Sequence, residues 1–473
     1  MKTDTIVAIA TALSDSGIGI IRVSGEQAIE IVNKIYVNKQ GKSTLLNHKT
    51  HTIRYGYIID CFHEAFEEAG SWKHAVIDEV MVAVMKAPHS YTAEDTVEIN
   101  CHGGVLLLQK VLELIVKCGA RIAQPGEFTK RAFLNGRIDL AKAEAVIDVI
   151  HSQNEFALKS SVNQLKGSVS EVVKQLREEI IYEIAFIESA LDDPEHISLD
   201  GYEERLQEKT EAILKQLQRL IASADNGKLM KEGINTVIVG KPNVGKSSLL
   251  NRLVGEERAI VTDIAGTTRD VLQESIKLHG IGLNMIDTAG IRNTEDVVEK
   301  IGVERAKEYA GKADLILYVV DASVPLDDSD REIISVIQEK KVIVLLNKSD
   351  LDMVVSEEKL LQAFEGDAPQ IIKTSTKENT GIDEFEEVIK QMFFQGDIKA
   401  NDEVIITNMR HKEALLDAEE SLKMVMNSLE NHMPEDFYSI DLMSAYASLG
   451  TIIGEEVGED LVNEIFSKFC MGK

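Results

Sequence analysis

The sequence predicts a multidomain α/β plus α protein: an N-terminal α+β domain, a discontinuous helical bundle and an inserted P-loop domain on a mainly parallel sheet. Three observations carry this prediction. Short β-type runs dominate the first part of the chain, and amphipathic helical patterns occupy two later segments. Between those segments, a strand, a glycine-rich loop and a helix follow one another from Thr236 to Leu250. The predicted domains are residues 1–122, 123–225, 226–397 and 398–473.

The chain is strongly acidic, with 51 Lys and Arg against 79 Asp and Glu and a formal net charge of -28. Such a chain is a poor general ligand for nucleic acid, because neutralising phosphates requires clustered Lys and Arg. Its 4 cysteines form no C-x-x-C pair, which indicates reduced thiols in a cytoplasmic protein. The sequence has no signal peptide and no apolar run of about 18 residues, so it predicts no membrane span.

The first 122 residues predict a compact α+β domain. The β-type runs lie at residues 5–11, 17–24, 51–59, 78–85 and 95–100. The helical patterns lie at residues 26–35 and 105–116. Arg22 and Glu98 each stand within a β-run, so each is either half of a sheet-surface ion pair or a ligand group. The charged segment from Cys61 to His74 is expected to be a surface insertion.

Helical segments flank the P-loop domain on both sides. They lie at residues 155–191, 202–224, 404–429 and 436–469. Gly450 and Gly454 are expected to interrupt the last of them. Near the start of the helical region, Arg131 and Arg137 lie among apolar neighbours and are either anion ligands or partners in surface salt bridges. Because the segments flank the P-loop domain, we expect one bundle into which that domain is inserted.

The segment from Gly240 to Ser247 fits the P-loop pattern G-x-x-x-x-G-K-[ST] between a β-branched strand and a helix. Gly245 lets backbone N–H groups close around phosphate oxygens, and the helix N-terminus adds its dipole. Lys246 is expected to reach the β- and γ-phosphates, and the Ser247 hydroxyl is expected to ligate magnesium.

Residues 259–270 lack periodicity and are rich in small polar residues, as a switch loop is. Thr267 and Thr268 are candidates for the threonine that completes the magnesium shell and senses the γ-phosphate. Asp287 follows a β-run and fits the carboxylate that holds magnesium through its water shell. Gly290 supplies a backbone N–H near the γ-phosphate.

The segment from Asn347 to Asp350 follows another strand and predicts the element that recognises the base. The Asp350 carboxylate can accept hydrogen bonds from guanine N1 and N2, which adenine cannot offer, so such a site rejects the wrong base by about 10⁴-fold or more. Ser375 to Lys377, after the last strand, are expected to contact the base from the other side. The sequence therefore predicts a guanine-nucleotide domain.

Two residues depart from the common pattern of such domains. Ile291 stands where many GTPases have a glutamine that orients the attacking water, and its side chain cannot hydrogen-bond water. Glu299 is our candidate for that role, and the alternative is an exposed helix carboxylate. Asn243 places a side-chain oxygen in the P-loop where phosphate binding requires none. This oxygen could coordinate a monovalent cation in the place of an arginine finger.

The chain ends at Phe469-Cys-Met-Gly-Lys473. Cys470 is four residues from the end, but Gly472 and Lys473 do not fit a prenylation signal, so we reject lipidation. The tail is either a frayed, inert terminus or a thiol, a cation and a carboxylate that reach into a site.

Taken together, these motifs make the chain closely resemble the MnmE (TrmE) family of tRNA-modification GTPases over essentially its whole length. The resemblance rests on residues 240–247, 262–269, 287–290, 125–128 with 131–135, and 470–473. The last two of these sequences are rarely found together outside this family.

The resemblance implies an N-terminal domain that binds a tetrahydrofolate derivative (5-formyl- or 5,10-methylene-tetrahydrofolate) and forms a homodimer. It implies a heterotetramer with MnmG, a flavoprotein that carries FAD. This chain and MnmG together would add an aminomethyl or carboxymethylaminomethyl group at carbon 5 of the wobble uridine of certain tRNAs. The chain would contact tRNA through this complex. It also implies GTP hydrolysis that requires potassium, which promotes dimerisation of the nucleotide domains.

The resemblance also implies roles for individual residues. Magnesium would be held by Ser247 and Thr268, and potassium by Asn243, Thr262, Ile264 and Thr267. The catalytic positions would be Glu299, Lys246 and Gly290. Folate would be bound by Arg22, Glu98, Arg137 and Lys473, with Cys470 taking part in tRNA modification. The predicted GTP contacts are Asn243, Val244, Gly245, Lys246, Ser247, Ser248, Thr262, Thr267, Thr268, Asp287, Thr288, Ala289, Gly290, Asn347, Lys348, Asp350, Ser375, Thr376 and Lys377.

Two positions depart from the family pattern. Arg137 is commonly Lys, which keeps the charge but changes the shape of the cation. Thr376 stands where Ala is usual. Two other functions compete with this interpretation: a regulatory switch GTPase in ribosome assembly, and a folate-dependent transferase whose nucleotide domain acts as a gate. The acidic composition counts against direct RNA binding by the first, which also leaves the Cys-Met-Gly-Lys tail unexplained.

Overall fold

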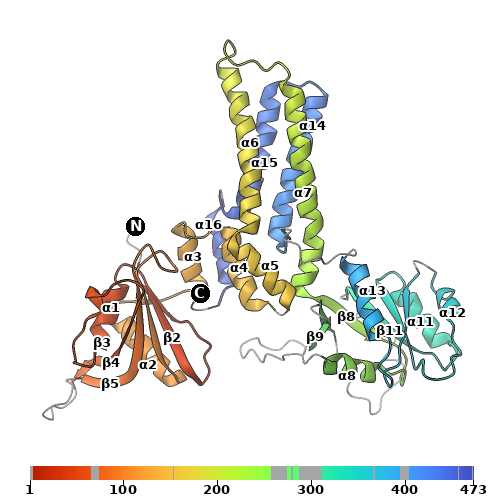
Figure 1. Cartoon of the computed structure of the whole chain (residues 1–473), viewed down its shortest axis with the longest axis horizontal. Coiled ribbons are helices and arrows are strands. Elements are labelled where there is room, and N and C mark those ends of the chain that lie inside the picture. Colours follow the sequence, from red (N-terminus) through yellow and green to blue (C-terminus); the bar gives the residue numbers. More distant parts are fainter. Residues whose placement is uncertain are drawn as a thin grey trace. The chain divides into compact units, whose positions relative to one another are not determined.

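The computed structural model describes residues 4–64, 74–152, 154–256, 274–278, 281–286, 311, 313–365, 368–394, 404–455, 457–470 and 472 (Figure 1). The chain forms two compact units. The first comprises Met1–Ile147, Gln164–Glu179 and Tyr446–Lys473, and the second comprises Asp148–Asn163 and Ile180–Ala445. Within the described ranges, no helix is long and apolar enough to cross a membrane.

The first unit contains a seven-stranded sheet in the order β3-β4-β5-β6-β2-β1-β7. Its strands are β1 (Ile6–Ile9), β2 (Ser16–Ser24), β3 (Tyr36–Val37), β4 (Thr52–Glu64), β5 (His74–Met85), β6 (Thr96–Gly103) and β7 (Arg121–Ile122). Neighbouring strands are antiparallel except β1 and β7. The predicted α+β fold of this region is therefore confirmed, and the middle of the predicted insertion, residues 65–73, lies outside the described residues.

One face of this sheet is buried by helices α1 (Ala28–Ile35) and α2 (Val105–Lys117). Side chains alternate along β6, as expected for a half-buried strand. Val97, Ile99 and Cys101 belong to the core that includes both helices. Thr96, Glu98 and Asn100, which alternate with them, do not. The opposite face of the sheet therefore carries the polar side chains discussed below.

Helices α3 (Glu127–Leu134), α4 (Leu140–His151) and α16 (Glu459–Ser467) bring the start and the end of the helical region together. One apolar cluster joins side chains from both segments: Leu140, Ala143, Val146, Val462, Phe466 and Phe469. In the second unit, α7 (Tyr202–Glu232) lies alongside α14 (Met409–Glu430), and Gln218 Nε2 donates to Glu419 Oε1 at 3.0 Å (Figure 1). Helical segments from before and after the P-loop domain thus pack on one another, as predicted.

Three helix boundaries differ from the prediction. The pattern over residues 155–191 is two helices, α5 (Glu155–Lys166) and α6 (Ser168–Asp192), separated by Gly167 at a φ of 110°. The first half of the bundle ends with α7 at Glu232, eight residues beyond the predicted end. Helix α15 (Glu435–Ile453) continues through Gly450 and ends just before Gly454, which has a φ of 90°.

The second unit contains a six-stranded sheet in the order β13-β12-β11-β8-β10-β9, parallel except for β9. Its strands are β8 (Ile234–Val239), β9 (Glu274–Leu278), β10 (Ile281–Met285), β11 (Leu315–Asp321), β12 (Val342–Asn347) and β13 (Gln370–Lys373). The helices that pack on this sheet are α8 (Lys246–Glu256), α11 (Asp328–Ile337), α12 (Glu357–Leu361) and α13 (Ile382–Phe394). Separate apolar clusters cover the two faces, one with α8 and α13 and the other with α11 and α12, as in doubly wound folds.

Candidate functional site

The loop from Gly240 to Lys246 joins β8 to α8 in a conformation that only certain residues adopt. Gly240, Asn243 and Gly245 have φ values of 148°, 65° and 104°. A β-carbon on Gly245 would lie 2.2 Å from Asn347 Nδ2, and one on Gly240 would lie 2.4 Å from the Val319 carbonyl oxygen. The two glycines are therefore required by space as well as by backbone conformation. The loop wraps the N-terminus of α8, where anions are favoured.

The Lys246 ammonium is turned toward its own loop. Its Nζ donates to the carbonyl oxygens of Gly240 at 2.7 Å and Lys241 at 2.6 Å. Burial lowers the pKa of this lysine to about 8. A phosphate that took the place of the two carbonyls would favour the charged form and raise this pKa.

This proton linkage predicts how nucleotide affinity varies with pH. Above pH 8 the free Lys246 is mostly neutral, so GTP binding must be accompanied by proton uptake. We expect the affinity for GTP to fall about fourfold from pH 7 to pH 8.5, which titration calorimetry would measure. Lys246→Arg, whose guanidinium stays charged, should bind with an affinity that changes less than twofold over this range. Equal pH dependence in both proteins would contradict the assignment.

Lys241 ties the P-loop to the N-terminus of α11. Its Nζ lies 2.8 Å from Asp327 Oδ2 and 2.7 Å from Asp330 Oδ2. The Asp330 side chain is buried, accepts from the Tyr318 hydroxyl at 2.9 Å and completes a capping box with Asp327. One buried carboxylate thus joins a strand, a helix and the first turn of the P-loop.

Lys241→Met is expected to lower the free energy of unfolding by about 1–3 kcal/mol, because buried Asp330 loses its charged partner but keeps the Tyr318 hydroxyl and a backbone N–H. Asp327→Asn alters the exposed partner and should cost about 0–1 kcal/mol. Urea denaturation of the full chain, followed by circular dichroism, would measure both. A larger loss from Asp327→Asn than from Lys241→Met would show that the buried carboxylate is not the centre of this contact.

The predicted base-recognition residues lie at the carboxyl ends of β12 and β13. Buried Asn347 donates from Nδ2 to the Val244 carbonyl at 2.8 Å, and its Oδ1 accepts from the Thr376 N–H at 3.3 Å. The Ser375 hydroxyl donates to Asp350 Oδ1 at 2.7 Å, and this hydrogen bond lowers the pKa of Asp350 below its usual value. Asn347 therefore bridges the P-loop and the 375–377 loop, a role that its place in the sequence motif did not predict.

Some of the remaining predicted residues of the nucleotide site lie within the described residues, and others lie outside them. Lys348, at a φ of 62°, pairs with Asp321 at the end of β11, with Nζ and Oδ2 2.5 Å apart. Ser247 and Ser248 lie in the first turn of α8. The positions that lie outside the described residues are Thr262, Ile264, Thr267, Thr268, Asp287, Thr288, Ala289, Gly290, Ile291 and Glu299.

A second group of predicted residues meets on the first sheet. Arg22 and Glu98 are cross-strand neighbours on β2 and β6, with Nε and Oε1 2.8 Å apart, so the ion-pair alternative describes their geometry. Arg22 also donates from a terminal nitrogen to the Gly472 carbonyl at 3.1 Å, which brings the C-terminal tail to this pair. The tail is held further by the Gly126 N–H, which donates to the carbonyl oxygen of exposed Cys470 at 3.4 Å. Lys473 lies outside the described residues.

Tyr91 joins the two arginines of this group, although nothing in the sequence pattern singled it out. The guanidinium carbons of Arg22 and Arg137 lie 5.4 Å and 5.0 Å from the centre of its ring. Arg22 also lies 5.7 Å from the ring centre of Phe128. The site thus combines two cations with aromatic rings and one carboxylate, an arrangement suited to an anionic ligand with a planar, hydrogen-bonding part.

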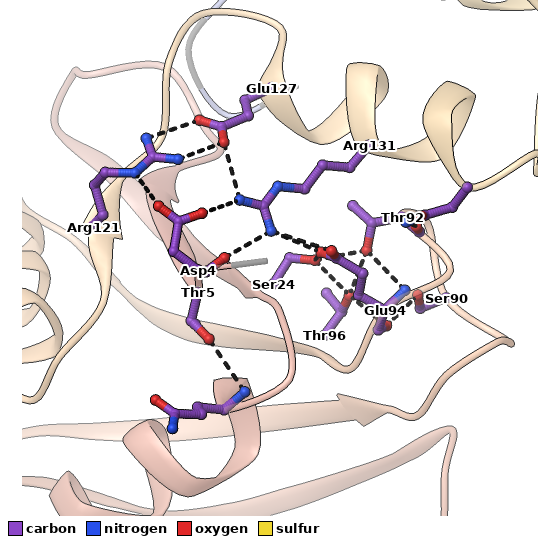
Figure 2. A network of polar contacts seen from close by, with 12 residues as sticks. Asp4, Thr5, Ser24, Ser90, Thr92, Glu94, Thr96, Arg121, Glu127 and Arg131 are labelled. Carbon is purple, nitrogen blue, oxygen red and sulfur yellow. Dashed lines mark hydrogen bonds and ion pairs between the residues drawn. The ribbon is translucent and has the colours of Figure 1, made fainter. Parts of the chain in front are cut away.

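Arg131 forms salt bridges, one of its two predicted alternatives, but its side chain is buried rather than on the surface. Its side chain is 8% exposed and lies within a network of ion pairs (Figure 2). The guanidinium contacts the carboxylates of Asp4, Glu94 and Glu127 at 2.9, 3.1 and 3.0 Å. The salt-bridge alternative for Arg131 is therefore confirmed, whereas its burial was not predicted, because two of its partners are distant in the sequence and left no local signal.

A P-loop after β8 and an Asn-Lys-x-Asp sequence after β12, at one edge of a parallel sheet, define a P-loop protein of the guanine-nucleotide class. The family model for the MnmE helical domain matches residues 140–470, and that for the GTP-binding protein TrmE N-terminus matches residues 5–137. The chain belongs to the MnmE family of tRNA modification GTPases.

Two relatives carry the name of this family. The tRNA modification GTPase MnmE of Lachnoclostridium phytofermentans is 57% identical over 100% of both chains. The protein of the same name from Clostridioides difficile is 48% identical over 99% of each chain. Among solved structures, the chain is similar to the G domain of the T. maritima FeoB iron transporter, at 25% identity and a TM-score of 0.25, over 33% of this chain and 97% of that one.

Proposed function

We propose that this chain is a potassium-dependent GTP hydrolase that acts with the flavoprotein MnmG in tRNA modification. Together they add an aminomethyl or carboxymethylaminomethyl group at carbon 5 of the wobble uridine, using a one-carbon unit from tetrahydrofolate. The observation that carries the proposal is Asn347, which ties the P-loop to the loop that holds Asp350 through Ser375. The loop proposed to bind phosphate and the loop proposed to contact guanine are thus connected through one side chain.

The oxygen-rich residues of the nucleotide domain suit hard cations. In this proposal, Ser247 and Thr268 hold magnesium, which neutralises the phosphates when bound. The proposed potassium ligands are Asn243, Thr262, Ile264 and Thr267. Glu299 orients the attacking water, because the side chain of Ile291 cannot, while Lys246 and the Gly290 N–H stabilise charge on the transferred phosphate.

Folate is proposed to bind at the site on the seven-stranded sheet of the first unit. Its proposed ligands are Arg22, Glu98, Arg137 and Lys473. The arrangement fits the chemistry of a folate: its glutamate carboxylates suit cations, and its pterin ring has N–H groups that a carboxylate accepts. Cys470 is proposed to take part in the tRNA modification. The domain limits after residues 122, 225 and 397 remain part of the proposal.

A homodimer and a larger complex complete the proposal. The sheet face that carries Arg22 and Glu98 also presents Ile53, Tyr55 and Met81, residues that are 65%, 48% and 50% exposed. An apolar patch of this kind beside a ligand site supports docking of a second copy. With a net charge of -28, the chain is expected to reach tRNA in the cytoplasm through its complex with MnmG rather than alone.

The proposal is tested in cells that lack this protein, by mass spectrometry of the wobble uridine of their tRNA. The wild-type chain is expected to restore the modified uridine, and Asp287→Ala, which removes the proposed magnesium-shell carboxylate, is not. Failure of the wild-type chain would exclude the tRNA function. Full restoration by Asp287→Ala would exclude a requirement for GTP hydrolysis.

A further inference from the structure

We propose that Arg131 is a positioning residue for the site formed by Arg22, Tyr91 and Arg137. Its guanidinium fixes the loop that carries the aromatic ring between the two cations. This inference deepens the folate part of the proposed function and rests on it.

Arg131 joins three segments of the first unit through one side chain. From α3 it donates to the Asp4 carbonyl oxygen at 2.8 Å and to the Asp4 carboxylate at 2.9 Å (Figure 2). The other contacts are Glu127, one turn earlier in α3, at 3.0 Å and Glu94 at 3.1 and 3.2 Å. A buried guanidinium requires such a set of acceptors, because each unpaired donor would cost desolvation free energy.

Glu94 belongs to the loop of residues 86–95, which joins β5 to β6. Its carboxylate also accepts from the Ser24 hydroxyl on β2 at 2.9 Å. The loop is closed on itself by Ser90, whose hydroxyl donates to the Glu94 carbonyl at 2.5 Å (Figure 2). Arg131 therefore holds the carboxyl-terminal end of this loop against the sheet and against α3.

The same helix holds the part of the loop that carries Tyr91. The Tyr91 and Thr129 hydroxyl oxygens lie 2.8 Å apart. Asn135, just after α3, donates from Nδ2 to the Thr92 carbonyl at 2.7 Å. The side chains of Thr129, Arg131 and Asn135 thus fix this loop at three places. These places are Tyr91, Glu94 and Thr92, respectively.

Tyr91 transmits this fixed position to the ligand site. Its ring lies against the guanidinium of Arg22, which is anchored on the sheet by Glu98, and against that of Arg137, which is exposed. The face of an aromatic ring attracts a cation, so the position of the ring determines where the cation lies. The separation of the two cations is therefore set by the position of Tyr91, and through it by Arg131.

Arg131→Lys tests this chain of contacts while keeping the charge. An ammonium cannot reproduce the directed hydrogen bonds of a guanidinium to three carboxylates. Isothermal titration of the full-length chain with 5-formyl-tetrahydrofolate is expected to give a Kd about tenfold higher for Arg131→Lys than for wild type. The Kd for GTP, measured on the same samples, should change less than twofold. Thr129→Val, which removes the hydroxyl bonded to Tyr91 and changes no charge, should raise the folate Kd in the same direction.

Arg121→Lys is the matched control, because Arg121 belongs to the same network through the carboxylates of Asp4 and Glu127 but has its other printed hydrogen bond to the Ile122 carbonyl rather than to the loop of residues 86–95. It should leave the folate Kd within twofold of wild type. Equal effects of Arg121→Lys and Arg131→Lys would overturn the inference, since a general loss of stability would then explain both. So would a folate Kd that neither Arg131→Lys nor Thr129→Val changes.

A second measurement needs no ligand. Hydrogen–deuterium exchange of peptides covering residues 86–95 is expected to be faster in Arg131→Lys than in wild type or Arg121→Lys. If the wild-type chain does not bind the folate, the folate part of the proposed function fails and exchange alone decides the positioning role. Unchanged exchange of residues 86–95 in Arg131→Lys would overturn that role.

Discussion

Asp350→Asn is expected to lower the affinity for GTP by about 10³-fold or more and to raise the affinity for xanthosine triphosphate. The Asp350 carboxylate accepts from the Ser375 hydroxyl at 2.7 Å, and this contact favours the ionised form that guanine N1–H and N2–H require. An asparagine amide would turn a donor toward the guanine amino group. Xanthine has an oxygen at that position, so the same amide would donate to it.

Competition titration with fluorescent GTP and xanthosine triphosphate measures both affinities. Asp352→Asn is a suitable control, because it makes the same chemical change at an exposed residue two positions away. It should leave both affinities within twofold of wild type. A GTP affinity lowered less than tenfold in Asp350→Asn, or no gain for xanthosine triphosphate, would contradict the assignment of the base contact.

Much of this nucleotide site could be predicted from sequence because its residues follow buried strands. Continuous apolar runs such as β8 and β12 predict strands covered on both faces, and their carboxyl ends meet at one edge of a parallel sheet. The P-loop glycines and Asp350 could therefore be placed together. The bridge from Asn347 to the Val244 carbonyl could not, because it depends on the register of side chains between two loops.

Features that depend on distant contacts left no local signal. Gly167 separates two helices, whereas Gly450 lies within one, although both occur in helical patterns. The difference is tertiary: a β-carbon on Gly450 would lie 2.8 Å from the nearest terminal nitrogen of Arg177, so this glycine is a packing site for a guanidinium. Arg131 is similar, since its ion-pair partners include Asp4, which lies near the start of the chain.

Asn243→Gly is expected to lower GTP hydrolysis in potassium about 10²-fold and to remove the difference between potassium and sodium. Asn243 has a φ of 65° and an exposed side chain, so it is not needed to shape the phosphate cradle by packing. Its side-chain oxygen is the feature left to explain. If that oxygen holds a cation where other GTPases insert an arginine, losing it removes charge stabilisation from the transition state.

The backbone conformation decides which variants separate these effects. Asn243→Ala would combine loss of the oxygen with about 1–2 kcal/mol of strain, because alanine disfavours a positive φ. Glycine adopts this φ freely, so Asn243→Gly removes only the oxygen, and the Kd for GTP should change less than threefold. Asn243→Asp keeps an oxygen and tolerates the same φ, and it should retain faster hydrolysis in potassium than in sodium.

The readout is the ratio of the hydrolysis rates in potassium and in sodium, measured for each protein at saturating GTP. This ratio cancels the weaker nucleotide binding that an added negative charge in Asn243→Asp would cause. A high ratio in wild type and Asn243→Asp, with a ratio near one in Asn243→Gly, would assign the cation to this oxygen. A high ratio in Asn243→Gly would instead mean that backbone carbonyls alone hold the cation, and that Asn243 is in the loop only because asparagine tolerates its left-handed conformation.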